Sequence, residues 1–327
     1  EHRHGMTPAP FASLYDFENA KQLFEGVHRS FNFCLLTLTG RDQRVERAEF
    51  AFFAHDPSDL SRHGARFGLT PEEIELLNPN TGTCPVFRSR RDAQITLGIY
   101  RRMPVLVRHG ATDGNPWGVA FMQGMFNMTS DSHLFHTADE LERDGWVLDG
   151  NRFLRGADQM LPLYEGKMIH HYDHRWATIG AEHASVAAMA ELRESSSFSP
   201  LPRYWVNSKD CASAMDRFDL TGSLLIYRNI ARSTDERTLI AAVVPRVAVG
   251  HGSPIIIPTS HSDCHLLACL LTSVVLDFVA RQKLGGTNLT FNLVQQFAIP
   301  TPASFRESPA FIRQPLSDFA LALFSGQ

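Results

Sequence analysis

Residues 78–102, NPNTGTCPVFRSRRDAQITLGIYRR, join two regions of different character and carry the densest positive charge in the chain. Their acidic counterpart is Asp92 alone, whereas the whole chain has a formal net charge of -4. A basic groove can exist on an acidic body, because the electric field that attracts a nucleic acid is local. From charge alone, a solvated helix face is the first interpretation of the stretch, and a nucleic-acid contact surface is the alternative. Its arginines are Arg88, Arg90, Arg91, Arg101 and Arg102.

Length and composition describe an ordinary globular chain. Its 327 residues are 43% hydrophobic and 20% charged, which suffices for one large domain or two smaller ones. The five cysteines are odd in number and irregularly spaced, so they do not form a disulfide framework and favour a reducing compartment. The first residues, EHRHGMTPAPF, lack the apolar run of a secretory signal. We therefore expect a cytoplasmic protein.

The most apolar helical segment runs from about Leu266 to Ala280 and contains Asp277. A membrane span needs about 20 predominantly apolar residues, so we interpret this segment as a buried core helix and expect no membrane contact. The helix is predicted to begin near Ser262 and to end at Gly285-Gly286, because glycine commonly terminates helices.

Two strongly β-prone segments stand near the beginning of the chain. FNFCLLTLTG (31–40) and AEFAFFAHD (48–56) are joined by a short charged connection, RDQRVER, and this pattern predicts an antiparallel hairpin. An isolated hairpin is only marginally stable in water, so this one must add to a larger sheet. Later strands of the chain or another part of a longer protein would supply that sheet. Residues 1–13 are expected to be disordered or to form a boundary segment.

Three helix starts carry capping signals. Thr70-Pro71-Glu72-Glu73 combines a capping threonine, a proline at the first helical position and a glutamate that reaches back, and Asn78-Pro79 ends the helix. Ser89–Asp92 and Thr137–Glu140 repeat the pattern at two further helix starts. Asp149-Gly150 lies between two β-prone runs and predicts a hairpin turn.

The second half of the chain predicts a mixture of strands and helices. GSLLIYRNIA (222–231) and RTLIAAVVPRVAVG (237–250) predict strands on either side of the polar turn STDE. Residues 180–200 are expected to form a mobile insertion, and the last residues a helix with an apolar face around Phe319, Leu321 and Leu323. The predicted fold class is mixed α/β.

A histidine-rich segment is the first candidate for chemistry. His170 and His174 are four residues apart, a spacing that on a helix can bind zinc. The surrounding segment, LPLYEGKMIHHYDHRWATIG, is more typical of a strand, so contact with phosphate or base and a structural role stand beside metal binding. A second set of possible ligands matches no common zinc spacing; its members are His261, Cys264, His265 and Cys269.

Motifs of self-contained nucleotide-binding or hydrolytic enzymes are missing from the sequence. No Gly-x-Gly-x-x-Gly follows a predicted strand, and neither Gly-Lys-Ser/Thr nor Gly-x-Ser-x-Gly occurs. These absences lower the expectation of a complete nucleotide-dependent enzyme or serine hydrolase in this chain.

Four segments together resemble a known family: NPNTGTCPVFRSRRDAQITLGIYRR, KMIHHYDHRWAT, YRNIARSTDERTLIAAVVPR and VARQKLGGTNLTFNLVQQFAIP. They are similar to the C-terminal half of large bacterial type II restriction–modification methylases, in which an adenine-specific DNA methyltransferase, often fused to an endonuclease, carries a target-recognition domain. The resemblance extends from about residue 14 to residue 302. The family's glycine motif for S-adenosylmethionine and its Asn-Pro-Pro-aromatic catalytic motif belong upstream and are absent from this sequence.

This resemblance implies a division of the chain and a set of partners. Residues 14–60 would be the end of a methyltransferase-like sheet, residues 61–110 a basic connector and residues 111–327 a mixed α/β target-recognition domain. The chain would have no catalytic residue, metal or cofactor of its own, and S-adenosylmethionine is expected only for the complete enzyme. Expected partners are double-stranded DNA and a methylase or endonuclease portion supplied by the same longer polypeptide or by another chain.

In this interpretation, arginines would position phosphates and a few side chains would read base edges in the major groove. Two other functions stay open: a protein-interaction piece that docks through the exposed edge of the 31–54 hairpin, and a histidine-based metalloenzyme. The candidate DNA contacts beyond the five arginines are Lys167, His170, His171, Arg175, Arg228, Arg232, Lys283 and Thr287.

Overall fold

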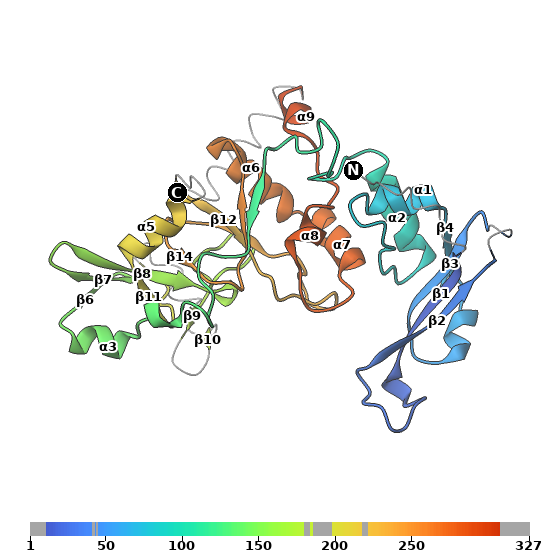
Figure 1. The fold of residues 1–327 in the computed structure, drawn as a ribbon, viewed down its shortest axis with the longest axis horizontal. Helices are drawn as coiled ribbons and strands as arrows, with labels where there is room; N and C mark the ends of the chain where they lie inside the picture. Colours follow the sequence, from blue (N-terminus) through green and yellow to red (C-terminus); the bar gives the residue numbers. More distant parts are fainter. Residues whose placement is uncertain are drawn as a thin grey trace.

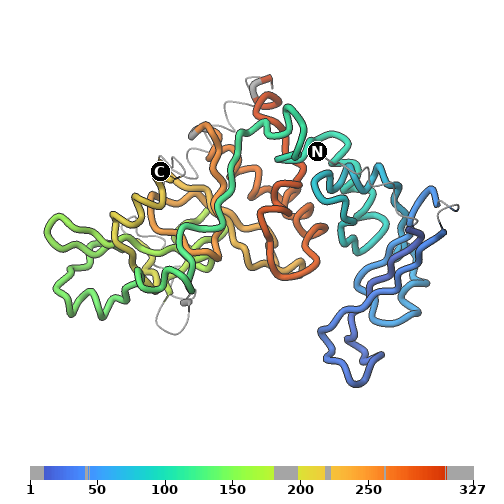
Figure 2. The backbone as a smooth tube through the Cα atoms, viewed as in Figure 1, coloured from blue at the N-terminus to red at the C-terminus, as the bar shows by residue number. Residues whose placement is uncertain are grey.

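The computed structural model describes residues 11–40, 43, 45–179, 184–185, 198–217 and 222–307. Within these residues the fold is mixed α/β, as predicted, with several sheets and with helices spread along the chain. An arm of residues 11–69, blue in Figures 1 and 2, stands at one end of the molecule. A helical connector of residues 70–102 joins it to a larger body, residues 103–307, which is coloured from green to red.

The arm is a four-stranded sheet of order β2-β1-β3-β4. The first strand pairs antiparallel with the second, where Tyr15 lies opposite Leu35, and parallel with the third, where Tyr15 lies opposite Ala51. The predicted hairpin between residues 31 and 54 is therefore wrong, because another strand lies between its two members. The strands are β1 (Phe11–Glu18), β2 (Asn32–Leu38), β3 (Ala48–Ala54) and β4 (Phe67–Leu69).

Long-range pairing explains why the arm differs from its prediction. Phe17 of β1 is fully buried, whereas most of β2 is exposed. This difference in burial agrees with a sheet in which β1 is an inner strand and β2 an edge strand. Residues 11–13, expected within a boundary segment, belong to this central strand. Residues 1–10 lie outside the described part of the chain.

The connector contains two capped helices at the predicted positions, α1 (Pro71–Leu77) and α2 (Arg90–Tyr100). Thr70 and Glu73 form a complete capping box, and the Ser89 hydroxyl accepts the backbone N–H of Asp92 at 3.2 Å. The inner face of α2, which includes Leu97 and Tyr100, packs into the large core shared by the arm, connector and body.

A buried sheet of order β13-β12-β15-β5 forms the middle layer of the body. Tyr227 faces the core that contains the helices, and its neighbour Ile226 faces a second core on the other side. As predicted, the two strands that flank the STDE turn pair antiparallel. The strands are β5 (Ala120–Met122), β12 (Leu224–Tyr227), β13 (Ala241–Val244) and β15 (Ile255–Ile257).

The outer end of the body is a second sheet of order β11-β8-β7-β6, with β14 added parallel to β8. The predicted turn at Asp149-Gly150 joins β6 to β7, and Gly150 has the left-handed φ of 60° that favours glycine there. The strands are β6 (Val147–Asp149), β7 (Arg152–Arg155), β8 (Asp158–Tyr164), β11 (Trp205–Asn207) and β14 (Ala248–Val249).

Short elements complete the fold around these sheets. The capped helix predicted at Thr137 is α3 (Ala138–Arg143), and α5 (Ser208–Asp216) packs against β8 and β11. Most of the predicted insertion at 180–200 and the predicted C-terminal helix around Phe319 lie outside the described residues. The remaining elements are β9 (Thr178–Ile179), β10 (Ala184–Ser185), α8 (Phe291–Val294), α9 (Pro302–Arg306) and the 3-10 turns η1 (Asn19–Lys21), η2 (Pro57–Ser61), η3 (Ser132–Leu134) and η4 (Gly166–Met168).

The single long helix predicted from Ser262 to Gly285 is two helices, α6 (His261–Leu271) and α7 (Val274–Lys283), bent by 65°. The Thr272 hydroxyl bonds back to the carbonyl of Ala268 at 2.9 Å, and the Ser273 hydroxyl accepts the N–H of Leu276 at 3.2 Å. These two hydroxyls end one helix and cap the next. In the described part of the chain no single helix is long and apolar enough to cross a membrane, although this bent pair passes by length and composition.

Candidate nucleic-acid interface

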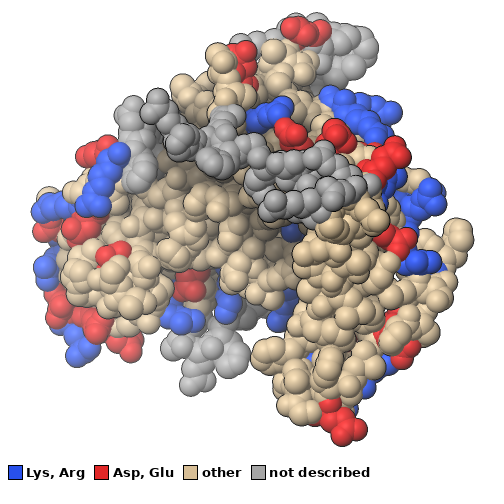
Figure 3. All heavy atoms as spheres, turned by 45° about the vertical axis from the view of Figure 1, so that its right-hand side comes forward, with Lys and Arg blue, Asp and Glu red and all other residues tan. Residues whose placement is uncertain are grey.

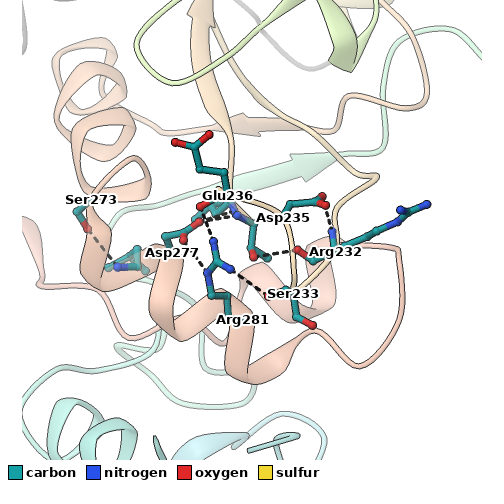
Figure 4. Close-up of polar contacts among 10 residues, drawn as sticks. Arg232, Ser233, Asp235, Glu236, Ser273, Asp277 and Arg281 are labelled. Carbon is teal, nitrogen blue, oxygen red and sulfur yellow. Dashed lines mark hydrogen bonds and ion pairs between the residues drawn. The ribbon is translucent and has the colours of Figure 1, made fainter. Parts of the chain in front are cut away.

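The loop between β12 and β13, residues 228–240, is fixed from below by two charged residues of α7 (Figure 4). Asp277 is 3% exposed, and one of its carboxylate oxygens accepts the N–H groups of Thr238 and Leu239 at 2.7 and 3.0 Å. A carboxylate is costly to bury without such partners. Its second oxygen accepts a hydrogen bond from Nε of Arg281 at 2.9 Å.

Arg281 extends this anchorage to the other half of the loop. Its guanidinium donates to the carbonyls of Ser233 and Glu236 at 3.0 and 2.6 Å. Asp277 therefore holds the end of the loop that enters β13, and Arg281 holds the tip. A loop fixed in this way loses little further conformational entropy when a ligand binds it.

The loop presents Arg232 to solvent. Its backbone N–H donates to Asp235 at 3.0 Å, and its carbonyl accepts the Thr238 hydroxyl at 3.1 Å. The side chain of Arg232 is exposed and points away from the Asp277 cluster in Figure 4. The backbone is thus held in place while the guanidinium stays available for a partner.

Arg88 links the loop to the arm. One of its guanidinium nitrogens donates to the Ser233 hydroxyl at 3.2 Å, and its Cζ lies 4.3 Å from the centre of the Phe53 ring. That separation is typical of a cation–π contact. Arg88 is exposed, so a predicted DNA contact stands at the boundary between the arm and the loop.

Several other predicted contacts surround the same loop. Arg228, at its start, donates to the carbonyls of Gly166 and Ile169 at 2.8 and 2.5 Å, next to the exposed Lys167. Thr287 accepts the N–H of Ala231 at 3.1 Å through its carbonyl. The structure thus gathers seven predicted residues around the β12–β13 loop: Arg88, Lys167, His170, His171, Arg228, Arg232 and Thr287.

Two predicted contacts serve the interior of the protein. Lys283 is 6% exposed; its amine donates to the Leu77 carbonyl at 2.5 Å and to the Asn78 side chain, and it lies 4.7 Å from the centre of the Tyr100 ring. Lys283 therefore joins α7 to the connector and has no surface for a phosphate, which corrects its prediction. Arg228 is half-buried, and its bonds to two carbonyls hold the 166–169 segment in place.

The histidine segment forms a tight turn. His170 and Asp173 exchange two backbone hydrogen bonds of 2.7 and 3.1 Å, and the His170 ring stacks on Trp176 at 4.0 Å. Burial lowers the pKa of His171, with a further contribution from the positive charge of Arg237. Burial also lowers the pKa of His174. Both shifts favour neutral rings, which can hydrogen-bond a phosphate but do not attract it as cations.

A second basic site, which we name the arginine hollow, lies between β3, β4 and α2. It is an open recess of about 460 Å³ lined by four arginines and two glutamates. Glu73 accepts Arg47 on one carboxylate oxygen and Arg101 on the other, both at 2.9 Å. Glu49 accepts Arg66 at 3.2 Å, and Arg90 has no ion-pair partner among the described residues. The recess therefore keeps an excess of positive charge.

Two of the four arginines in this hollow, Arg90 and Arg101, were predicted from the sequence as DNA contacts. The other two, Arg47 and Arg66, were not predicted. These two are separated in sequence from the 88–102 cluster, and the pairing of β3 with β4 brings them to it. The charged connection RDQRVER, which ends at Arg47, was the available signal. The remaining predicted contacts stand apart: Arg91 and Arg102 are exposed, and Arg175 is half-buried with its backbone N–H bonded to Asp173.

Metal ligation was the alternative for the histidines. Among the residues that the structure describes, no group of three histidine, cysteine or acidic side chains is placed to hold a metal ion. In the second candidate set, Cys264 is buried in the helical core and Cys269 is partly buried. The geometry thus assigns these cysteines to packing.

Basic side chains are visible on one face of the molecule. In Figure 3, Lys and Arg side chains, with Asp and Glu side chains among them, lie along the lower margin of the body beside the recess that separates it from the arm. The face of the arm in that view is largely free of charge. In this view, the two parts therefore differ in the charge of the face they show.

Comparisons with known proteins give little further guidance. No protein-family model matches the sequence, and no curated protein matches it. Among solved structures, that of the type IIG restriction endonuclease BpuSI superposes on 95% of this chain with a TM-score of 0.41 and 13% sequence identity. The chain spans 38% of the length of that enzyme.

Proposed function

We propose that this chain is the DNA target-recognition module of an adenine-specific restriction–modification methyltransferase. The observation that carries the proposal is that two sites present arginines to solvent, one on an anchored backbone and one beside carboxylates that orient them. One is the anchored β12–β13 loop with Arg232, and the other is the arginine hollow. The resemblance of four sequence segments to such enzymes supports the choice of DNA as the ligand.

The two sites suit different parts of the task. Phosphate contacts fix the position of a protein on the duplex, and contacts to base edges determine the sequence that is read. The hollow offers several guanidinium groups in one recess, which suits phosphate oxygens. The β12–β13 loop is anchored by Asp277 and Arg281 and exposes Arg232 at its tip, beside the exposed Asp235 and Glu236, and an exposed arginine suits a contact in the major groove.

Binding of the purified chain to random-sequence duplex DNA at a series of salt concentrations tests the proposal. The logarithm of the binding constant should fall linearly with the logarithm of salt, by about 0.9 per phosphate contact. The double variant Arg90→Ala/Arg101→Ala should weaken binding and reduce this slope. The control Arg143→Ala/Arg152→Ala removes the same charge from exposed positions on the outer part of the body.

Equal losses in the two double variants would mean that net charge, rather than the hollow, attracts DNA. No binding at low salt would overturn the proposal. S-adenosylmethionine is expected to bind the complete enzyme and not this chain alone, so a calorimetric titration with S-adenosylmethionine should give no binding signal. A clear binding isotherm would contradict the assignment of the chain as a recognition module without the cofactor site.

A second candidate function is docking on a separate methylase or nuclease portion. It is favoured by β2, an edge strand whose free side is accompanied by exposed apolar residues. Phe31, Leu35 and Leu38 are 62%, 54% and 59% exposed. Exposed edge strands pair readily with other chains, and this one carries no charged residue to prevent it. Co-purification with a partner, without DNA affinity of the chain alone, would favour this function.

A further inference from the structure

Tyr172 occupies a backbone position that tyrosine rarely adopts. It is the second of two residues in the turn closed by His170 and Asp173, and its φ is 59°. Among the described residues, the only other non-glycine residues with positive φ are Gln22 and Phe53. Glycine or asparagine is usual at such a turn position, because a larger side chain crowds the backbone. A residue with this conformation is often retained for function.

The turn holds the Tyr172 ring at the surface. The stack of His170 on Trp176 supports the base of the turn. The ring is 42% exposed, and its hydroxyl donates to the carbonyl of Thr272 at 3.5 Å, where α6 ends. The proton of the hydroxyl is therefore engaged, and the aromatic ring is the apolar part of Tyr172 that a ligand can contact.

The surroundings of the ring are apolar on one side and carry charged groups, arginines among them, on the other. At the same corner, the first turn of α7 exposes Val274 by 66% and Val275 by 53%. On the other side is the β12–β13 loop. Arg237 and Arg228 act electrostatically on His171, the neighbour of Tyr172, and so do the carboxylates of Asp277 and Glu236. An aromatic ring beside cations suits a nucleic acid, because the ring contacts a base while the cations attract phosphates.

We propose that Tyr172 is a base-contacting residue and helps to set the sequence preference of this chain. The inference rests on the proposed DNA-recognition function. The ring would pack through its face on a base edge, with the methyl group of thymine as the most favourable partner, since that group is the apolar feature of the major groove. Val274 and Val275 would extend the same apolar contact.

The variant Tyr172→Gly separates a recognition role from a structural one. Glycine adopts a φ of 59° without crowding, so the variant should unfold at the same temperature as the wild type or at a higher one. Tyr172→Phe keeps the ring and removes only the hydroxyl, and it is the matched control. Each protein would select from a pool of random-sequence duplexes, and the enriched sequences would be compared position by position.

We expect the wild type and Tyr172→Phe to enrich the same motif. Tyr172→Gly should bind random duplex with the same salt dependence but lose the preference at one or two adjacent positions. Replacing thymine by uracil at those positions should reduce wild-type binding and leave Tyr172→Gly unaffected. If the wild type discriminates but uracil has no effect, the ring contacts another feature of the base and the thymine assignment is wrong.

Other outcomes would overturn the inference. An unchanged motif in Tyr172→Gly, or a wild type that binds duplex DNA without sequence preference, refutes base contact by Tyr172 and leaves the DNA-binding proposal standing. A wild type that binds no DNA at low salt refutes both proposals. A lower unfolding temperature for Tyr172→Gly, with its motif intact, would show that the ring serves the fold.

Discussion

Replacing Asp277 by alanine should release the β12–β13 loop and destabilise the protein. In the wild type, one carboxylate satisfies two backbone N–H groups, of the buried residues Thr238 and Leu239, and pairs with Arg281. Alanine supplies no acceptor, so both N–H groups lose their partner inside the protein. Arg281 would keep its two carbonyl acceptors but lose its counter-ion.

The size of the effect follows from these losses. Breaking a buried ion pair by removing one partner costs about 3–5 kcal/mol, and each stranded buried donor costs about 1–3 kcal/mol. These two costs overlap, because both count the loss of the same carboxylate. The Arg281 side chain is 26% exposed, so water compensates part of the lost ion pair. We therefore expect Asp277→Ala to lower the free energy of unfolding by about 3–4 kcal/mol. Asp277→Asn keeps an acceptor for the two N–H groups and should cost about 1–2 kcal/mol.

Urea unfolding of the wild type and both variants measures these free energies. The exposed pair of Arg108 and Glu75, whose side chains are 56% and 66% exposed, provides the control. Glu75→Ala should cost at most about 1 kcal/mol, because water screens such a pair. If Asp277→Ala costs no more than Glu75→Ala, the carboxylate does not anchor the loop. The anchorage that we assign to the β12–β13 loop would then have no basis.

Three further results are expected. Burial lowers the pKa of Lys283 well below 10.5, so the folded state releases a proton that the unfolded state keeps. Below about pH 9, where the buried cysteines are protonated in both states, the contribution of Lys283 to stability should therefore rise with pH, by at most about 1.4 kcal/mol per pH unit, and Lys283→Met should remove this contribution in unfolding experiments. Leu36→Lys on β2 should leave thermal stability unchanged but abolish any co-purification of a partner, since Leu36 is exposed. Iodoacetamide should modify Cys34 first, because Cys34 is exposed and burial raises the pKa of both Cys211 and Cys264 to about 12. Mass spectrometry would measure the labelling of each cysteine, and equal labelling would contradict the burial of Cys211 and Cys264.

Local signals in the sequence predicted local structure well. The capping boxes at Thr70 and Thr137 and the turn at Gly150 depend on residues within a few positions of one another, and all three are present. The order of the strands in the arm depends on pairing between distant segments. Nothing in the 31–54 stretch indicates that β1 lies between β2 and β3. The break between α6 and α7 had a local signal in Thr272-Ser273, which an apolar pattern on both sides concealed.

The candidate site shows the same division. The sequence shows where the charge lies but not which charged side chains are buried. Lys283 and Arg232 look alike as basic residues near glycine-rich or polar turns, yet one fills the interior and the other extends into solvent. Arg47 and Arg66 join the hollow only because two strands pair.

The carboxylates within the basic surfaces have two opposite effects on the proposed DNA interface. Each flexible side chain that a ligand must immobilise costs about 0.5–1.5 kcal/mol on binding. Glu73 already restricts Arg47 and Arg101, so part of that cost is met on folding. The same carboxylate weakens attraction at long range, because it neutralises one of the charges it orients. Glu73 thus lowers the general attraction of the hollow for DNA and fixes the positions of its arginines. In the proposed recognition module, this combination favours selection of a site over tight binding to any duplex.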